Sequence, residues 1–170
     1  MIVFRGTQKL LKEVRLRKEE LDDPGEGFMG SWFVNVFRLE RRKSVLISND
    51  RTLYSVLLYG LQRADFDDLG SRFVAGLASN LKRDGFDTGL IASICMTCHP
   101  IKWAVTNSRS VLGSMNDMIS ISKRMVALRR QNIERDVAYL NCDLNRTPMS
   151  ALEHIVPMDE MRIALMDWSP

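Results

Sequence analysis

The chain has 170 residues, of which 45% are hydrophobic and 26% are charged, with 10 glycines, 5 prolines and 10 methionines. This composition excludes a disordered chain, a collagen-like repeat and a disulfide-stapled miniprotein, and the length suits one domain over residues 1–170. Lys and Arg outnumber Asp and Glu by 24 to 21, and this net charge of +3 is too small for a nucleic-acid coat protein.

The N-terminal residues lack the basic segment, apolar segment and cleavage site of a secretory signal peptide. No stretch approaches the roughly 20 apolar residues of a membrane-spanning helix. Three cysteines are also too few for a secreted disulfide framework. We therefore expect a cytoplasmic protein with no membrane association.

The first half of the chain is predicted to supply most of a sheet. Residues 2–5 form the first strand, and Thr7 has the side chain of a helix N-cap. Residues 32–39 and 44–48 are rich in aromatic and β-branched residues, and the four charged residues between the two runs predict a hairpin. Because both faces of the 32–39 strand are apolar, we expect it at the centre of the sheet, with helices on at least one face.

The middle of the chain is predicted to be mainly helical. Asp50 or Thr52 would cap a helix that includes Leu53, Val56, Leu57 and Leu61, and further helices are expected over residues 66–81 and 90–98. Residues 101–106 alternate between apolar and polar side chains, which predicts another strand.

A long amphipathic helix begins at about residue 110 in this prediction, opened by Ser108 or Ser110. The tail contains two short helices, with Pro148 and Pro157 near their starts. The predicted fold is a single α+β domain. Its small antiparallel sheet, with strands near 2–5, 32–39, 44–48 and 101–106, packs against several helices.

Cys95, Cys98 and His99 form the C-x-x-C-H pattern of covalent haem attachment. That chemistry needs an oxidising compartment, and a zinc site that adds Cys142 lacks the second half of a zinc motif. Ordinary buried thiols are the favoured interpretation, so no metal or cofactor is predicted. The sequence also lacks the common nucleophile, phosphate-loop and zinc-protease motifs, so the catalytic residues remain unknown.

Residues 106–117 combine a strand end, a polar turn and a helix start. Unpaired N–H groups and the positive end of the helix dipole favour an anion there, and Arg109 adds a forked cation. The candidate ligand-binding residues are Thr7, Asn35, Thr106, Ser108, Arg109, Ser110 and Asn116. The alternative is an elaborate N-cap combined with helix packing.

The hairpin carries a second candidate, a basic nucleic-acid-binding surface formed by Arg38, Arg41, Arg42 and Lys43, with Arg5 and Lys9 as further members. The preferred alternative is a charged sheet edge that prevents aggregation. On the long helix, Met115, Met118 and Met125 are either core residues or a self-association surface, and a homodimer is expected on general grounds.

Several segments resemble a bacterial family of small stand-alone proteins of unknown function. They are the R-x-T-Q-K-L-L start at Arg5, W-x-x-N at Trp32, R-R-K-x-V-L at Arg41, S-R-S-V-L-G-S-M-N-D at Ser108 and L-N-R-T-P-M at Leu144. The resemblance implies a shared fold but no activity.

We therefore expect a non-catalytic binding or interaction module with an anion-accepting pocket at the start of the 110–130 helix. The alternatives are an enzyme acting on a phosphorylated or nucleotide-like substrate, and a nucleic-acid-binding accessory protein that uses the hairpin.

Overall fold

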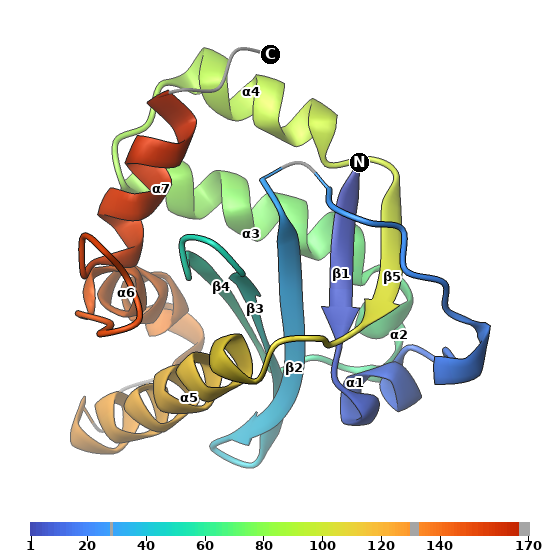
Figure 1. The fold of residues 1–170 in the computed structure, drawn as a ribbon. Coiled ribbons are helices and arrows are strands. Elements are labelled where there is room, and N and C mark those ends of the chain that lie inside the picture. The colour runs from blue at the N-terminus through green and yellow to red at the C-terminus, as the bar shows by residue number, and fades with distance from the viewer. Residues whose placement is uncertain (28, 130–132, 167–170) are drawn as a thin grey trace.

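A five-stranded sheet with the order β4-β3-β2-β1-β5 forms the centre of the computed structural model, which describes residues 1–27, 29–129 and 133–166 (Figure 1). The strands are β1 (Ile2–Gly6), β2 (Ser31–Leu39), β3 (Arg42–Asn49), β4 (Ser55–Tyr59) and β5 (Ile101–Val105). The α+β fold predicted from the sequence is confirmed.

The sheet is mixed, which corrects the prediction of an antiparallel one. Strands β2, β3 and β4 pair antiparallel, whereas β1 pairs in parallel with both β2 and β5. Parallel neighbours need long crossovers, and the chain supplies them. A helical segment separates β1 from β2, and three helices separate β4 from β5.

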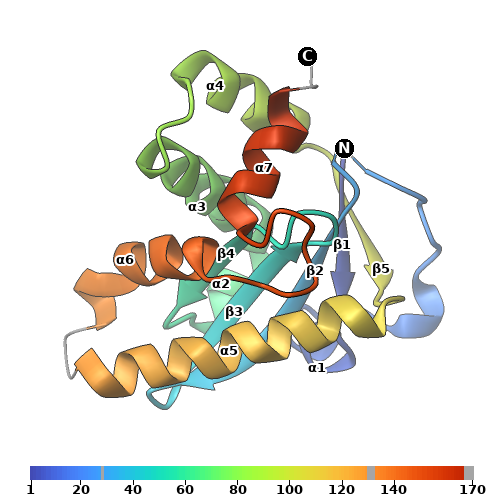
Figure 2. The same ribbon diagram turned by 60° about the vertical axis from the view of Figure 1, so that its left-hand side comes forward.

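Helices cover both faces of the sheet (Figures 1 and 2). They are α1 (Gln8–Glu13), α2 (Arg63–Asp67), α3 (Leu69–Arg83), α4 (Thr88–Thr97), α5 (Arg109–Arg129), α6 (Ile133–Arg146) and α7 (Pro157–Met166), with a short 3-10 helix at Lys18–Glu20. One core lies between the sheet and the helices α1–α4 and α7, and it contains Phe4, Trp32 and Phe73. The other contains Phe33 and Met118 and lies under α5 and α6. Strand β2 is therefore central and covered on both faces, as its apolar sequence predicts.

The predicted helix around residues 53–61 is wrong, because this segment contains strand β4. Its apolar residues form an almost continuous run, which fits a buried strand as well as a helix. Asp50 and Thr52 cap no helix; they lie in the turn before β4, where the Asn49 carboxamide oxygen accepts from the N–H groups of Arg51 and Thr52. In the tail, Pro157 begins α7 as predicted, but Pro148 lies in irregular structure after α6.

The hairpin between β2 and β3 has a two-residue turn. Glu40 and Arg41 have φ values of 45° and 67°, the left-handed conformation that both central residues adopt in a type I′ turn. The long helix begins at Arg109, in agreement with the predicted start near residue 110. Among the described residues, no helix combines the length and apolar character needed to cross a bilayer.

Two asparagines of α6 close most of the free edge of β4. The Asn145 carboxamide accepts from the Ser55 N–H at 2.7 Å and donates to the Ser55 C=O at 2.9 Å. Asn141 makes the same pair of bonds to Leu57, at 2.7 and 3.0 Å. Since both side chains are buried, these bonds satisfy backbone groups that no strand pairs with. We call these two residues the asparagine ladder.

Candidate functional site

The carboxyl ends of β1 and β5 lie side by side. Gly6 pairs with Val105 at the last residue of each strand, so Thr7 and Thr106 follow at neighbouring positions. After β1 the chain continues into α1, and after β5 it continues into α5, and these two helices lie on opposite faces of the sheet. Helix α1 contributes to the core that contains Trp32, whereas α5 contributes to the core that contains Met118. In open parallel sheets, ligands commonly bind in a crevice outside the strand ends at such a switch point. We call this place the β1–β5 crevice.

Thr7 links helix α1 to strand β2 at the β1–β5 crevice. Its hydroxyl accepts from the Leu10 N–H at 3.3 Å, which confirms the predicted N-cap, and donates to the Asn35 Oδ1 at 3.2 Å. The bond to Thr7 fixes the orientation of the half-buried Asn35 carboxamide. The described residues offer no hydrogen-bond acceptor to the Asn35 Nδ2 group, so this donor is available to a ligand.

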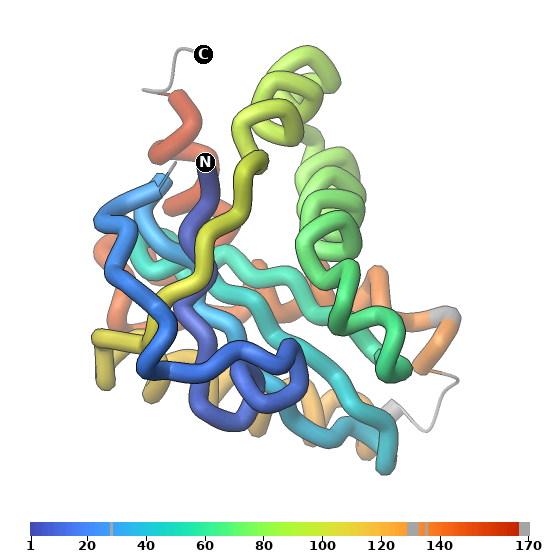
Figure 3. Tube along the Cα trace, turned by 90° about the vertical axis from the view of Figure 1, so that its right-hand side faces the viewer, coloured from blue at the N-terminus to red at the C-terminus, as the bar shows by residue number. Residues whose placement is uncertain are grey.

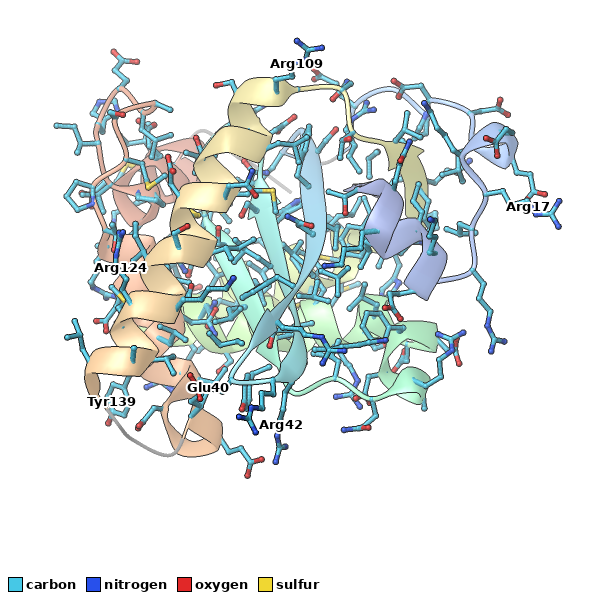
Figure 4. The ribbon with its side chains drawn as sticks, turned by 90° about the horizontal axis from the view of Figure 1, so that it is seen from below. Arg17, Glu40, Arg42, Arg109, Arg124 and Tyr139 are labelled. Carbon is cyan, nitrogen blue, oxygen red and sulfur yellow. The ribbon has the colours of Figure 1, made fainter. Side chains whose placement is uncertain are left out.

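Ser108 caps helix α5 by accepting from the Val111 N–H at 3.3 Å. The next two residues, Arg109 and Ser110, are exposed, and the Arg109 side chain extends outward from the end of the helix (Figure 4). The first turn of α5 contains no acidic residue that would offset the positive end of the helix dipole. The candidate residues Thr7, Asn35, Thr106, Ser108, Arg109 and Ser110 therefore come from segments that meet at one end of the sheet.

Asn116 does not belong to this group. It lies seven residues beyond Arg109 on α5, which corresponds to roughly 10 Å along the helix axis. Its exposed side chain therefore lies about two turns away from the helix start. Asn116 was included in the candidate set because it follows the polar turn closely along the chain. In the structure the helix places it too far from the other candidate residues to share a ligand with them.

Arg5 is a buried cation beside the β1–β5 crevice, and the prediction that it joins the basic hairpin is wrong. Only 4% of the residue is exposed, and its Nε donates to the Ser31 Oγ at 2.9 Å. Its Nη1 and Nη2 atoms donate to the two carboxylate oxygens of Asp23 at 3.2 and 2.9 Å. The Arg5 guanidinium lowers the pKa of Asp23, mainly through these hydrogen bonds. Asp23 belongs to the segment between α1 and β2, which runs along the β5 side of the sheet (Figure 3).

Three of the four basic side chains of the hairpin, those of Arg38, Arg42 and Lys43, have partners within the protein. Arg42 pairs with Glu134 at 2.7 Å, and Lys43 pairs with Glu13 at 2.8 Å. Arg38 donates to the Arg41 carbonyl oxygen. Figure 4 shows Arg42 at the opposite end of the molecule from Arg109. The two ion pairs reduce the positive potential that phosphate-backbone contacts would need. The alternative of a charged sheet edge is wrong, because β2 and β3 are inner strands of the sheet.

A family model described as a domain of unknown function, DUF6933, matches residues 3–160. The chain belongs to this family. The match confirms the resemblance to a family of unknown function that the sequence segments indicated. No curated protein matches the chain.

In this DUF6933 chain the long-helix methionines lie against the sheet. Met115 and Met118 are completely buried in the core under α5 and α6, and Met125 packs against the same core while partly exposed. Two of the three methionines of the predicted self-association surface are therefore inaccessible to a second molecule. The packing favours the alternative, in which these methionines are core residues. The Met118 sulfur lies 3.3 Å from the Ser55 Oγ, a contact that suits a polarisable thioether.

The cysteines of the C-x-x-C-H pattern lie at the end of α4. Cys98 is buried and donates to the Ile94 carbonyl oxygen, and burial raises its pKa to about 12. This is the environment of an inert structural thiol. In the described parts of the chain, no group of three or more His, Cys, Asp or Glu side chains is arranged to hold a metal ion.

A second polar cluster, which was not predicted from the sequence, joins distant segments of the DUF6933 fold. The Tyr54 hydroxyl donates to Asp84 at 2.6 Å, and Arg146 pairs with the same carboxylate at 2.7 Å. Burial and the Asp84 charge raise the pKa of Tyr54, so this hydroxyl stays protonated and acts as a donor. The asparagine ladder was missed as well, although Asn141 and Asn145 are polar residues within the apolar face of a helix, which is a recognisable signal.

Proposed function

We propose that this protein is a non-catalytic binding module that accepts an anionic group in the β1–β5 crevice. The observation that carries the proposal is the Asn35 Nδ2 donor, which Thr7 orients and the described residues leave unpaired. A half-buried amide donor with unused capacity is suited to a ligand that accepts hydrogen bonds.

The neighbouring groups favour a ligand with negative charge. The start of α5 presents backbone N–H groups, Arg109 supplies an exposed guanidinium, and Ser110 and Thr106 add hydroxyls. Hydroxyl, carboxamide and guanidinium groups bind and orient an anion, whereas acid–base catalysis most often uses His, Glu or Asp, and the candidate set contains none of these residues. For this reason binding is preferred over the alternative of an enzyme acting on a phosphorylated substrate.

A titration with inorganic phosphate and with ribose 5-phosphate, followed by thermal unfolding, tests this proposal. We expect both ligands to raise the Tm of the wild-type protein and the increase to shrink strongly in Arg109→Ala and Asn35→Ala. Arg124→Ala is the matched control, because it removes an exposed arginine from the same helix far from the crevice. An unchanged Tm for the wild type, or equal losses in Arg109→Ala and Arg124→Ala, would contradict the proposal.

We also propose that the protein acts in the cytoplasm as a homodimer. Several large apolar side chains are exposed outside the two cores and are candidates for a subunit contact, namely those of Met96, Leu128, Tyr139, Ile155, Ile163 and Met166. Light scattering on protein eluted at tens of micromolar should give twice the chain mass, since an obligate dimer persists at that concentration. A single-chain mass would contradict the dimer and would leave the anion proposal to its own test.

A further inference from the structure

The asparagine ladder leaves the last residue of β4 open. Asn145 and Asn141 bind the backbone of Ser55 and Leu57, two alternate residues whose N–H and C=O groups face away from β3. In an antiparallel pair these groups alternate between the two edges of a strand, so those of Tyr59 face the same free edge. The described residues give the Tyr59 N–H and C=O no partner there.

The geometry of the ladder shows why it stops at two members. Helix residues four apart are separated by about 6 Å along the axis, and strand residues two apart by about 6.6 Å, so the two repeats run nearly in step. The position after Asn145 and Asn141 in this repeat is residue 137, which would face Tyr59. It is Val137, and its side chain has no hydrogen-bonding group.

A groove of about 440 Å³ opens at this point. Its apolar lining includes Tyr59, Leu61 and Val137. Its charged lining consists of two ion pairs, Arg42 with Glu134 and Arg72 with Asp65, so the formal charges balance. A groove with balanced charges and a lining that is partly polar and partly apolar favours a neutral ligand that carries a polar group on an apolar body.

We propose that this groove binds a small, neutral, partly apolar ligand through its primary carboxamide. The carboxamide oxygen accepts from the Tyr59 N–H, and its NH2 group donates to the Tyr59 C=O. The bound ligand thereby supplies the third member of the ladder. The Asn141 carboxamide makes this pair of bonds one step along the same edge, at 2.7 and 3.0 Å, so the chemistry that fits the edge is already present in the fold. A carboxylate has no donor and matches only half of the edge.

Benzamide is a suitable probe, and N,N-dimethylbenzamide is its matched control because it keeps the carbonyl group but has no N–H donor. In a titration of ¹⁵N-labelled full chain, we expect benzamide to shift the Tyr59 amide signal saturably and the dimethyl compound to leave it nearly unchanged. Equal shifts with both compounds, or no saturable shift with benzamide, would overturn the proposal. A response to adenosine but not to benzamide would overturn it too, because it would assign the groove to a nucleobase.

The variant Val137→Asn provides a second and independent test. It places a carboxamide of the chain itself opposite Tyr59, so we expect a higher Tm and the loss of the benzamide shift. Val137→Leu is the control, since it keeps an apolar side chain at that position and should retain binding. Undiminished benzamide binding by Val137→Asn would contradict the proposal. Phosphate binding at the β1–β5 crevice is expected to stay unchanged in both variants, so the two proposals succeed or fail separately.

Discussion

Asparagine has different surroundings in two regions of this molecule. On α6, Asn141 and Asn145 are buried, and their carboxamides form hydrogen bonds with the chain itself, chiefly with the edge of β4. At the β1–β5 crevice, the Asn35 carboxamide is half-buried and its oxygen binds Thr7, while its Nδ2 group has no partner among the described residues.

The difference separates structural polar residues from candidate binding residues. A buried side chain whose donors and acceptors are used by the fold stabilises that fold, and its removal leaves backbone groups unsatisfied. A partly exposed side chain that is held in place but retains a donor is available to another molecule. The same residue type therefore has opposite expected effects on stability and on binding in the two regions.

The largest effect is expected from Asn145→Ala. This change removes both bonds to Ser55 and leaves its buried N–H without a partner, at about 1–3 kcal/mol, whereas the Ser55 C=O still accepts from the Asn80 Nδ2 at 3.2 Å. We expect urea unfolding to show a loss of about 2–4 kcal/mol in the free energy of unfolding, from one unsatisfied N–H and one further lost hydrogen bond.

Asn35→Ala is the matched comparison for Asn145→Ala. Since the Asn35 carboxamide makes one hydrogen bond in a half-buried position, we expect a loss of about 1 kcal/mol or less. A similar loss of stability in both variants would remove the distinction between the two regions.

A smaller effect is expected from Thr7→Val, which keeps the shape of the side chain but removes the hydroxyl. The N-cap bond to Leu10 is lost, at about 0.5–2 kcal/mol, and the Asn35 carboxamide is no longer oriented. Urea unfolding measures the first consequence and phosphate titration the second. Thr7→Ser should restore both, because serine retains the hydroxyl. If Thr7→Val binds phosphate as well as the wild type does, the orientation of Asn35 has no role in binding.

The smallest effect concerns Asp23 and depends on pH. Its pKa in the folded protein is lowered from the ordinary value of 3.8, mainly by its hydrogen bonds to Arg5. The stabilisation is therefore fully present above that ordinary value and is lost as the pH falls through the lower folded pKa. The Tm of Asp23→Asn should lie below that of the wild type at pH 6, and the two values should converge below pH 3.8. A constant difference across this range would show that the ion pair with Arg5 does not cause it.

Local signals in the sequence predicted much of the fold. The apolar run of β2, the Thr7 cap and the start of α5 each depend on neighbouring residues, and each is confirmed. The β4 segment was predicted incorrectly because a short apolar run fits both a strand and a helix, and only its pairing with β3 distinguishes them.

The candidate site residues, too, could be selected from the sequence only by residue type and not by their contacts. The sequence selected Thr7, Asn35 and the residues around Ser108 by type, and the parallel pairing of β1 with β2 and β5 brings their segments together. It also selected Asn116, which lies about two helical turns beyond the start of α5, and the hairpin residues Arg42 and Lys43, which form ion pairs with α6 and α1. Arg5 looked like a surface charge until its contact with Asp23, 18 residues away, was known.

The composition by itself excluded disordered, fibrous and strongly basic classes, because length, residue counts and net charge are properties of the chain alone. The order of the strands, the burial of Met118 and the asparagine ladder depend on contacts between residues far apart in the sequence. Such contacts leave little trace in local periodicity. The tertiary structure therefore decided which polar groups the fold already uses, and which ones remain for a ligand.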